Sequence, residues 1–419
     1  MTRVAPGPAA SVAHGPARGW AYPGWRMVAV LAVTETISYA ALFYAFAVIV
    51  TPMRDELGAS TAQVSGALSV SLAVAGLAAP LVGRWVDRRG ARALMTAGSV
   101  LAGVSVLAWS QVRTVPQLYA VFVGIGLAGA MVLYEPAFAV VNTWFRRRRA
   151  QALLVVTVVA GFSSTIFLPV TQAMVDDVGW RGAVVVLAAL VGACAIPHAA
   201  VLRRSPQDLG LTPDGPASEE PHDQAPASSA DRRTAGARRA ALRWLTVAAV
   251  AHAMAVTVVA VHLVAYLRDS GLSPAVAATG AGALGLMSVT GRLAFTGAAA
   301  RLGLARVAAL MLAAQAGGVV LLLVVPQPAG LVTFVLLFGT GFGVMTIARA
   351  ALLGELIPVA AFAAVSGQQA LAATIGRVAA PAVAGAVITS AGFSPALMGV
   401  AVCCLIGAAS LVLVGNLSR

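Results

Sequence analysis

The sequence contains no lysine: all 28 of its Lys+Arg residues are arginine. A Walker-type phosphate-binding loop and a Schiff-base cofactor both require a lysine, so neither fits this chain. ATP-driven pumping by the chain itself is therefore not expected. Charged residues of all kinds are also scarce, at 10% of the sequence.

Cysteine is scarce as well. Cys194, Cys403 and Cys404 lie in apolar stretches and lack the spacing of a metal or redox motif. We interpret them as packing residues. The sequence therefore predicts neither a metal site nor a cofactor.

Hydrophobic residues, in contrast, make up 59% of the 419 residues, and the mean hydropathy is +0.88. That share of the chain is about 247 residues, more than a single soluble core can bury. A membrane span needs about 20 apolar residues, so this number suffices for roughly twelve spans. A soluble enzyme, a disordered regulator and a small disulfide scaffold are thereby excluded.

The positions of the spans follow from the apolar runs and from the Gly, Pro and Arg residues between them. The first apolar run begins only after Arg26, which predicts a cytoplasmic tail over 1–25 without a cleavable signal peptide. The twelve predicted spans lie near 26–50, 62–82, 91–110, 116–141, 150–174, 182–202, 242–266, 274–298, 304–325, 329–352, 360–388 and 394–415.

One long hydrophilic stretch, 203–241, divides these spans into two sets of six. It contains five prolines together with Asp, Glu, Ser and Arg, a composition typical of a flexible cytoplasmic linker. The predicted domains are therefore an N-terminal six-helix bundle over 26–202, the linker, a C-terminal six-helix bundle over 242–415 and a cytoplasmic C-terminus over 416–419.

The arginines predict the orientation. With the N-terminus inside, the cytoplasmic segments hold 21 arginines and the outside loops hold four, namely Arg54, Arg113, Arg181 and Arg268. We therefore expect an integral protein of the cell (cytoplasmic) membrane, in contact with lipid, with both termini cytoplasmic. The formal charge of +13 is explained by this asymmetry, so we expect no nucleic-acid partner.

The loop between the second and third predicted spans, 83–92, reads GRWVDRRGAR. It resembles the signature loop of the major facilitator superfamily. Its two glycines permit a tight turn, and Asp87 can meet a helix N-terminus or an arginine of a neighbouring helix. That pairing would break when the two halves of a transporter rock, whereas the alternative is a loop that only anchors the positive side. The predicted gating residues are Gly83, Asp87, Arg88, Gly90 and Arg92.

A degenerate copy of this loop follows six spans later. The segment 300–303, ARLG, aligns with 87–90, DRRG, and Ala300 replaces the acid. The repeat indicates two related bundles. The expected fold is thus all-α, with twelve transmembrane helices in two pseudo-symmetric six-helix bundles, as in the major facilitator fold.

Four further segments make the chain similar to the branch of that superfamily that contains monocarboxylate transporters and oxalate/formate exchangers. They are YEP at 134–136, WFRRRR at 144–149, GWR at 179–181 and the pair Gly291-Arg292. Drug/proton antiporters usually carry an early arginine in the fourth span and a Gly-Pro-Gly-Gly type motif in the fifth. Here 120–124 reads AVFVG and 161–165 reads GFSST, without those features. Members of the carboxylate branch often place an Asp one turn before the arginine of span 8, where this chain has Ser288.

Charges inside the predicted spans are few, and each costs roughly 2.5 to 3.5 kcal/mol at the bilayer centre unless it is paired or hydrated. They are Glu35, Glu135, Arg292, Arg349 and Arg377. Arg349 is nearer the inner end, which favours a structural role for it.

We assign Arg292 and Arg377, with Tyr39 and Tyr134, to a substrate-binding site. A guanidinium can hold a carboxylate through two parallel hydrogen bonds. The alternative is that these arginines pair internally with the two buried acids and only cancel charge.

Glu35 and Glu135 are the only acids deep in the spans, and a membrane interior disfavours their ionisation. Either could carry a coupling proton, and we favour Glu135, which adjoins Tyr134 and the helix-bending Pro136, whereas Glu35 lies between two threonines and could be a hydrogen-bonded structural acid. His252 is a third candidate and His262 a fourth, although a single histidine on an apolar helix is more often a hydrogen-bonded core residue.

The sequence predicts a secondary active transporter that moves a small organic anion, together with protons, by alternating access and functions as a monomer. A transporter that exports a larger amphipathic drug or secondary metabolite is an alternative, and a transporter-like membrane sensor is another. The sequence has no HExxH, GxSxG or paired-carboxylate motif, so we expect no enzyme.

Overall fold

The computed structural model describes residues 22–214 and 229–417. These residues form helices and connecting loops, and no strand occurs among them. Three stretches of the predicted domains lie outside the described residues: 1–21 of the tail, 215–228 of the linker and 418–419 of the C-terminus.

The helices form two groups, which we call the N-half and the C-half. The N-half contains α1 (Pro23–Tyr39), the π-helix η2 (Ala40–Tyr44), α2 (Ala45–Leu57), α3 (Thr61–Arg89), α4 (Ala91–Trp109), α5 (Val115–Val132), α6 (Tyr134–Trp144), α7 (Arg149–Gly161), α8 (Ser163–Ala193) and α9 (Ala195–Val201). The C-half contains α10 (Ser229–Asp269), α11 (Pro274–Leu302), α12 (Leu304–Val324), α13 (Ala329–Phe342), α14 (Val344–Leu356), α15 (Val359–Ala391) and α16 (Phe393–Leu417). A short 3-10 turn, η3 (Gln207–Leu209), lies between the halves in the chain.

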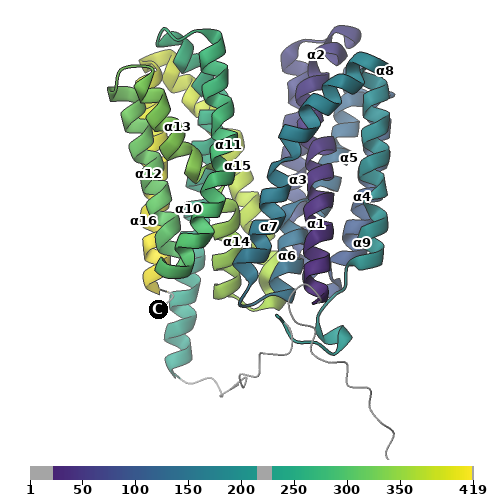
Figure 1. Ribbon diagram of the computed structural model, residues 1–419, viewed down its shortest axis with the longest axis vertical. Helices are drawn as coiled ribbons and strands as arrows, with labels where there is room; N and C mark the ends of the chain where they lie inside the picture. Colours follow the sequence, from purple (N-terminus) through teal and green to yellow (C-terminus); the bar gives the residue numbers. More distant parts are fainter. Residues whose placement is uncertain (1–21, 215–228, 418–419) are drawn as a thin grey trace, which may run out of the picture.

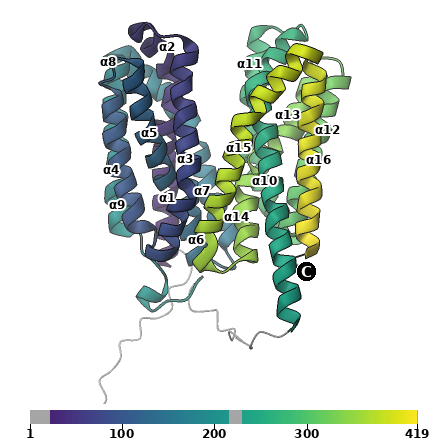
Figure 2. The same ribbon diagram turned by 180° about the vertical axis from the view of Figure 1, so that it is seen from behind.

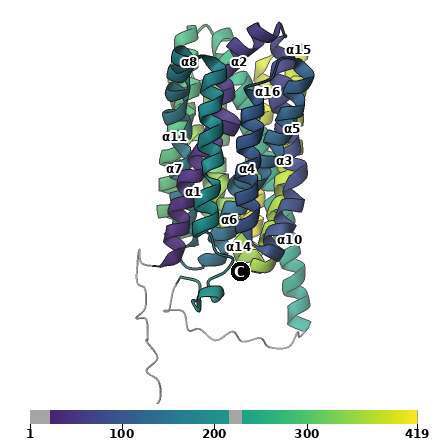
Figure 3. The ribbon, with the colours of Figure 1, turned by 90° about the vertical axis from the view of Figure 1, so that its right-hand side faces the viewer.

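The two halves stand side by side, with most helices along the long axis of the molecule (Figures 1 and 3). They approach each other chiefly along α3 and α15 and also at α6, α7, α11 and α14, and their helices diverge toward the end that carries α2 and the top of α11 (Figures 1 and 2). The loops before α4 and before α7, with their clustered arginines, lie at the other end, which we call the arginine-rich end.

Ten segments of the described residues are long and apolar enough to cross a membrane, which indicates an integral membrane protein. One of them, Arg149–Val201, is 53 residues long and contains the non-helical residue Gly179, with φ 74° and ψ 164°. The 29-residue helix α11 is a further long apolar element beside these ten. The number of crossings therefore depends on how these two segments are counted.

The predicted repeat is visible in the backbone. Gly90, between α3 and α4, has φ 79° and ψ 168°, and Gly303, between α11 and α12, has φ 87° and ψ 146°. Residues with a side chain rarely adopt this conformation, so both loops need a glycine at the same place. The second copy of the loop thus keeps its turn even though Ala300 has replaced the acid.

Several helices are interrupted inside their apolar segments. The first segment contains the π-helix η2, extended backbone at Leu133 separates α5 from α6, and Phe162 lies between the end of α7 and the start of α8. In the C-half, Gly343 separates α13 from α14. Such breaks are stable at membrane depth where the irregular backbone is buried in protein or lines a cavity, so they point to the region between the halves.

The GWR segment fixes the end of the N-half that is opposite the arginine-rich end. The indole Nε1 of Trp180 donates to Glu56 Oε2 at 2.6 Å, and Arg181 donates to Glu56 Oε1 at 2.9 Å. Arg181 also donates to the backbone carbonyl of Val112 at 2.7 Å. These bonds hold α2, α8 and the loop after α4 together as one unit.

The start of the linker packs on the arginine-rich end of the N-half. The carboxylate of Asp214 accepts hydrogen bonds from the backbone N–H groups of Arg146, Arg147 and Arg148 at 2.8, 2.6 and 3.2 Å. A carboxylate at the beginning of a helix satisfies N–H groups that have no partner within the helix. Residues 203–214 of the predicted linker are therefore docked against the N-half.

Candidate functional site

Asp87 joins the two halves at the arginine-rich end. Its carboxylate oxygens accept hydrogen bonds from the backbone N–H groups of Ala363 and Ala364 at 2.9 and 2.8 Å, near the N-terminal end of α15. The positive end of a helix dipole favours a carboxylate there. A Cβ at Gly83 would lie 2.0 Å from the carbonyl oxygen of Ala363, so glycine is needed for the close approach of α3 and α15.

The other predicted gating residues contact the N-half. Arg92 donates to the carbonyl oxygen of Ala199 at 2.8 Å. The exposed side chain of Arg88 lies at the surface, and its carbonyl oxygen accepts from Arg204 at 3.0 Å. Their gating role remains a prediction.

A second contact between the halves lies at Glu135, the second residue of α6. Glu135 forms an ion pair with Arg349 of α14, 2.5 Å apart, and accepts a hydrogen bond from Ser366 of α15. The two charged side chains are 23% and 12% exposed, so the pair is partly hydrated. Glu135 is thus paired with Arg349 instead of with Arg292 or Arg377, and the structural role of Arg349 stays a prediction.

Tyrosines and arginines from the two halves meet beside this ion pair. Tyr39 of α1 and Tyr134 of α6 pack with ring centroids 4.8 Å apart. Arg292 of α11 interacts electrostatically with Tyr134 and with Tyr44, and Arg377 of α15 does so with Tyr39. The structure thus brings together all four residues that the sequence assigns to a substrate site, and it adds Tyr44.

Arg292 reaches across the interface. Its Nη1 donates to the backbone carbonyl of Thr157 in α7 at 2.5 Å, whereas its buried Nε has no hydrogen-bond partner in the part of the chain that the structure describes. A buried donor without a partner costs about 1–3 kcal/mol. The guanidinium is therefore held at the interface with donor capacity left for a ligand.

Arg377 projects into an accessible space. Its side chain is exposed, although it interacts electrostatically with Tyr39 and Glu135 of the N-half. Among the described residues, none forms a hydrogen bond or ion pair with it. A cation in this position, near Tyr39 and without an ionic partner among the described residues, can bind an anion that enters between the halves.

Glu35 lies in the interior of the N-half and is completely buried. Neither of its carboxylate oxygens has a hydrogen-bond partner among the described residues. An unpaired buried carboxylate costs several kcal/mol, so this side chain is suited to hold a proton. Of the two acids among the predicted proton carriers, the sequence favours Glu135, but Glu35 is the one without a cationic partner in the described residues.

The two histidines that the sequence singles out, His252 and His262, occupy the C-half. His252 of α10 is buried next to Gln315 of α12 and the backbone of Phe342, where it interacts with both. His262 lies within 3.3 Å of the carbonyl oxygen of Pro381. The position of His262 matches a hydrogen-bonded histidine, whereas the buried Nδ1 of His252 has no hydrogen-bond partner among the described residues, and His252 is within electrostatic range of Arg377.

The sequence did not single out His198 of α9. Its ring nitrogens lie 3.0 Å from the hydroxyls of Ser99 and Thr34, so it connects α4 and α1 inside the N-half. Nor did the sequence single out Ser366, the hydroxyl partner of Glu135. A single serine or histidine on an apolar helix carries no local signal of such a partner.

No group of three or more His, Cys, Asp or Glu residues that could hold a metal ion occurs in the described ranges. Comparison with known proteins identifies the family of the chain. The family model for the Major Facilitator Superfamily matches residues 31–381, most of the chain. The chain belongs to the Major Facilitator Superfamily.

Relatives of this superfamily transporter include monocarboxylate transporters. It is 28% identical to monocarboxylate transporter 13 of Bos taurus over 357 residues, which are 82% of this chain and 77% of the relative. It is 30% identical to monocarboxylate transporter 4 of Rattus norvegicus over 216 residues, which are 49% of this chain and 43% of the relative. This second match thus spans less than half of the relative's length.

The fold of the superfamily transporter also matches solved structures. FucP, a Major Facilitator Superfamily transporter in the outward conformation, superimposes with a TM-score of 0.69 over 94% of this chain and 98% of the other, at 16% identity. The all-helical major facilitator fold expected from the sequence is therefore confirmed. The family and the relatives are transporters rather than enzymes.

In this superfamily transporter, we expect Asp87→Asn to lower turnover at saturating substrate while substrate binding is retained. The amide keeps one acceptor oxygen and loses the charge, so the contact with α15 weakens by about 1–2 kcal/mol, a factor of about 5–30 in the balance between two states. Exchange rates and binding isotherms of the purified variant would measure the effect. Asp269→Asn, at the exposed end of α10, is the matched control, and unchanged turnover of Asp87→Asn would contradict a gating role.

Proposed function

We propose that this protein is a secondary active transporter that moves a small monocarboxylate-like anion together with protons by alternating access. The observation that carries the proposal is the pair of cations, Arg292 and Arg377, that the C-half presents to tyrosines of the N-half at the interface. An arginine binds a planar carboxylate through two hydrogen bonds, and an aromatic surround lowers the local dielectric. The names of the relatives agree with this substrate class.

We further propose twelve crossings in two six-helix bundles, over 26–202 and 242–415, acting as a monomer. This count takes the long segment Arg149–Val201 as two spans separated at Gly179 and adds α11 to the other nine segments. The backbone correspondence between Gly90 and Gly303 supports a repeat with this topology.

The arginine-rich end is proposed to be cytoplasmic, with both termini on that side of the cell membrane. The hydrogen bonds of Asp87 and the ion pair of Glu135 join the halves between that end and the site. In this orientation the described conformation is closed to the cytoplasm and faces outward. Both contacts must break before the site can open to the cytoplasm.

Coupling to protons is assigned to Glu35. Its burial without a partner favours a bound proton when the site faces outward, and release requires a state in which water or a cation reaches it. A proton carried with a monoanion makes net uptake sensitive to the pH gradient.

The test is solute flux in proteoliposomes that contain the purified protein. We expect uptake of a monocarboxylate such as lactate to be accelerated by an inwardly directed proton gradient and to be prevented by a protonophore. The corresponding uncharged amide should not be taken up. Flux of an amphipathic drug without carboxylate flux would favour the exporter alternative, and absence of any flux would favour the sensor; either result would refute the proposal.

A further inference from the structure

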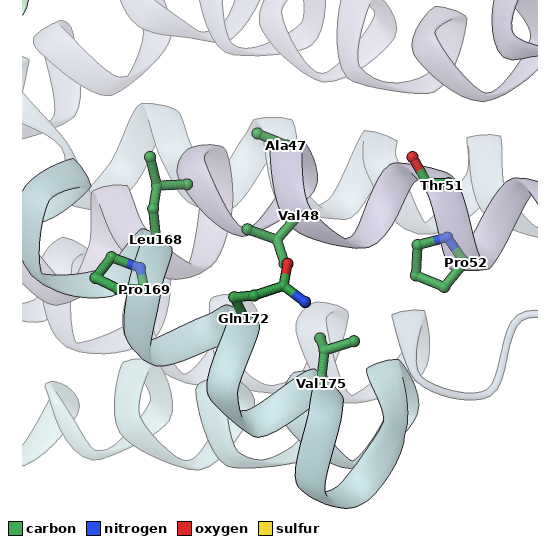
Figure 4. A pocket seen from close by; sticks show the side chains of 8 residues that line it. All are labelled: Ala47, Val48, Thr51, Pro52, Leu168, Pro169, Gln172 and Val175. Atoms are coloured by element: carbon green, nitrogen blue, oxygen red, sulfur yellow. The ribbon is translucent and has the colours of Figure 1, made fainter. Parts of the chain in front are cut away.

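An open cavity lies in the N-half between α2 and α8, away from the paired charges at the interface (Figure 4). Its volume is about 600 Å³, within the range of about 300–1,000 Å³ for small-molecule sites. α2 contributes residues that include Val48 and Thr51, and α8 contributes residues that include Leu168 and Gln172. We call this cavity the α2–α8 groove.

The groove continues the helix faces that meet Arg292. Tyr44, which interacts with Arg292, also interacts with Ser164 at the start of α8. Val48 lies one helical turn beyond Tyr44, and Leu168 lies one turn beyond Ser164, on the same helix faces. The groove therefore begins about 6 Å along the helices from the Tyr44–Ser164 contact and leads away from the arginine-rich end.

The lining of the groove has no charged side chain, and six of its eight residues are apolar, the polar two being Thr51 and Gln172. Its residues are Ala47, Val48, Thr51, Pro52, Leu168, Pro169, Gln172 and Val175. The amide of Gln172 donates to Asp176 at 2.8 Å, so part of its polar capacity is already used. Such a wall offers no positive charge to a second anionic group, whereas its six apolar side chains can remove hydrocarbon from water.

The cationic site and the groove lie next to each other. Together they match a ligand that has a carboxylate at one end and a hydrocarbon body at the other. We propose that the α2–α8 groove holds the hydrocarbon body of the substrate while Arg292 and Arg377 bind its carboxylate. The substrate class is then an extended, apolar monocarboxylate, and the smallest acids use only part of the site. This inference rests on the proposed function, because it assumes that the arginines bind a carboxylate.

The first test uses a series of unbranched monocarboxylates of increasing length in proteoliposomes. Each methylene group that enters the groove should lower the half-saturation concentration by up to about fourfold, until the groove is filled. A half-saturation concentration that is independent of chain length would overturn the inference. The proposed function would survive that result, whereas absence of all carboxylate transport would remove the proposed function itself.

The second test is a matched pair of substitutions on α8. Leu168→Trp fills the groove, and Val170→Trp introduces the same side chain at a position that is 44% exposed and does not line the groove. We expect Leu168→Trp to reduce the ratio of long-chain to short-chain uptake at least tenfold, and Val170→Trp to leave this ratio unchanged. Because both readouts are ratios for one preparation, a difference in the amount of folded protein does not affect them.

Ala47→Trp fills the groove from the α2 side. It provides a second test that does not depend on the folding of the α8 variant. Its side chain is exposed, so the larger ring needs no rearrangement of a packed core. It should reduce the same ratio. If both groove variants keep the wild-type ratio, the groove is occupied by something other than substrate, such as a lipid acyl chain, and the inference is wrong.

Discussion

Replacing Arg292 by lysine should reduce carboxylate uptake by about 10- to 100-fold while the protein remains folded. Lysine keeps the charge but loses the planar fork that can hold a carboxylate and the Thr157 carbonyl at the same time. Losing one hydrogen bond to a charged group costs about 1.5–3 kcal/mol, which corresponds to that range. Initial uptake rates over a range of substrate concentrations would measure it.

Arg301→Lys provides the matched control. Arg301 lies on the same helix, α11, and is exposed at its arginine-rich end. This variant should transport normally, and both variants should unfold at the wild-type temperature. Near-normal uptake by Arg292→Lys would remove Arg292 from the site and leave Arg377 as the remaining cation for a carboxylate.

The second large effect concerns Glu35. We expect Glu35→Gln to abolish accumulation driven by a pH gradient and to preserve exchange of substrate for substrate. The amide cannot take up or release a proton, whereas exchange requires only that the loaded site reorients. Gln has the same shape and tolerates burial better than an unpaired carboxylate, so stability should not fall. Net uptake on a proton gradient and counterflow in the same vesicles would separate the two activities.

Glu135→Gln is the comparison that distinguishes the two acids. Its carboxylate holds Arg349 and Ser366 across the interface, so its loss should weaken the contact between the halves and change net uptake and counterflow together. If both glutamine variants still concentrate substrate on a proton gradient, coupling through these carboxyls is wrong, and His252 becomes the next residue to replace.

The sequence predicted the helical segments well because apolar runs and arginine clusters are local features. Asp87 was also predictable in its contact with a helix N-terminus, since a carboxylate between two glycines at a helix end has few other partners. The intramembrane charges were found for the same reason: each is rare in an apolar run. Their roles in gating, binding and coupling remain predictions.

The partners of these charges could not be predicted. Glu135 and Arg349 are 214 residues apart, and the pairing depends on how α6 and α14 face each other across the interface. The break at Leu133 likewise has no glycine at the break itself, so its position depends on tertiary packing. Tyr44 was missed because its place in the site follows from the π-helix, which shifts the register of every residue after Ala40.

Arg377 has a further consequence for the energetics of the transport cycle. Because it has no ionic partner among the described residues, the empty site carries fixed positive charge, and a bound monoanion reduces that charge. One charge that crosses the whole membrane field changes the free energy by about 2.3 kcal/mol per 100 mV, and a site that switches sides carries part of it. The coupling proton on Glu35 restores the charge that the anion removes, so the membrane potential should act equally and in opposite directions on the loaded and the unloaded reorientation and leave proton-coupled uptake as a whole unchanged.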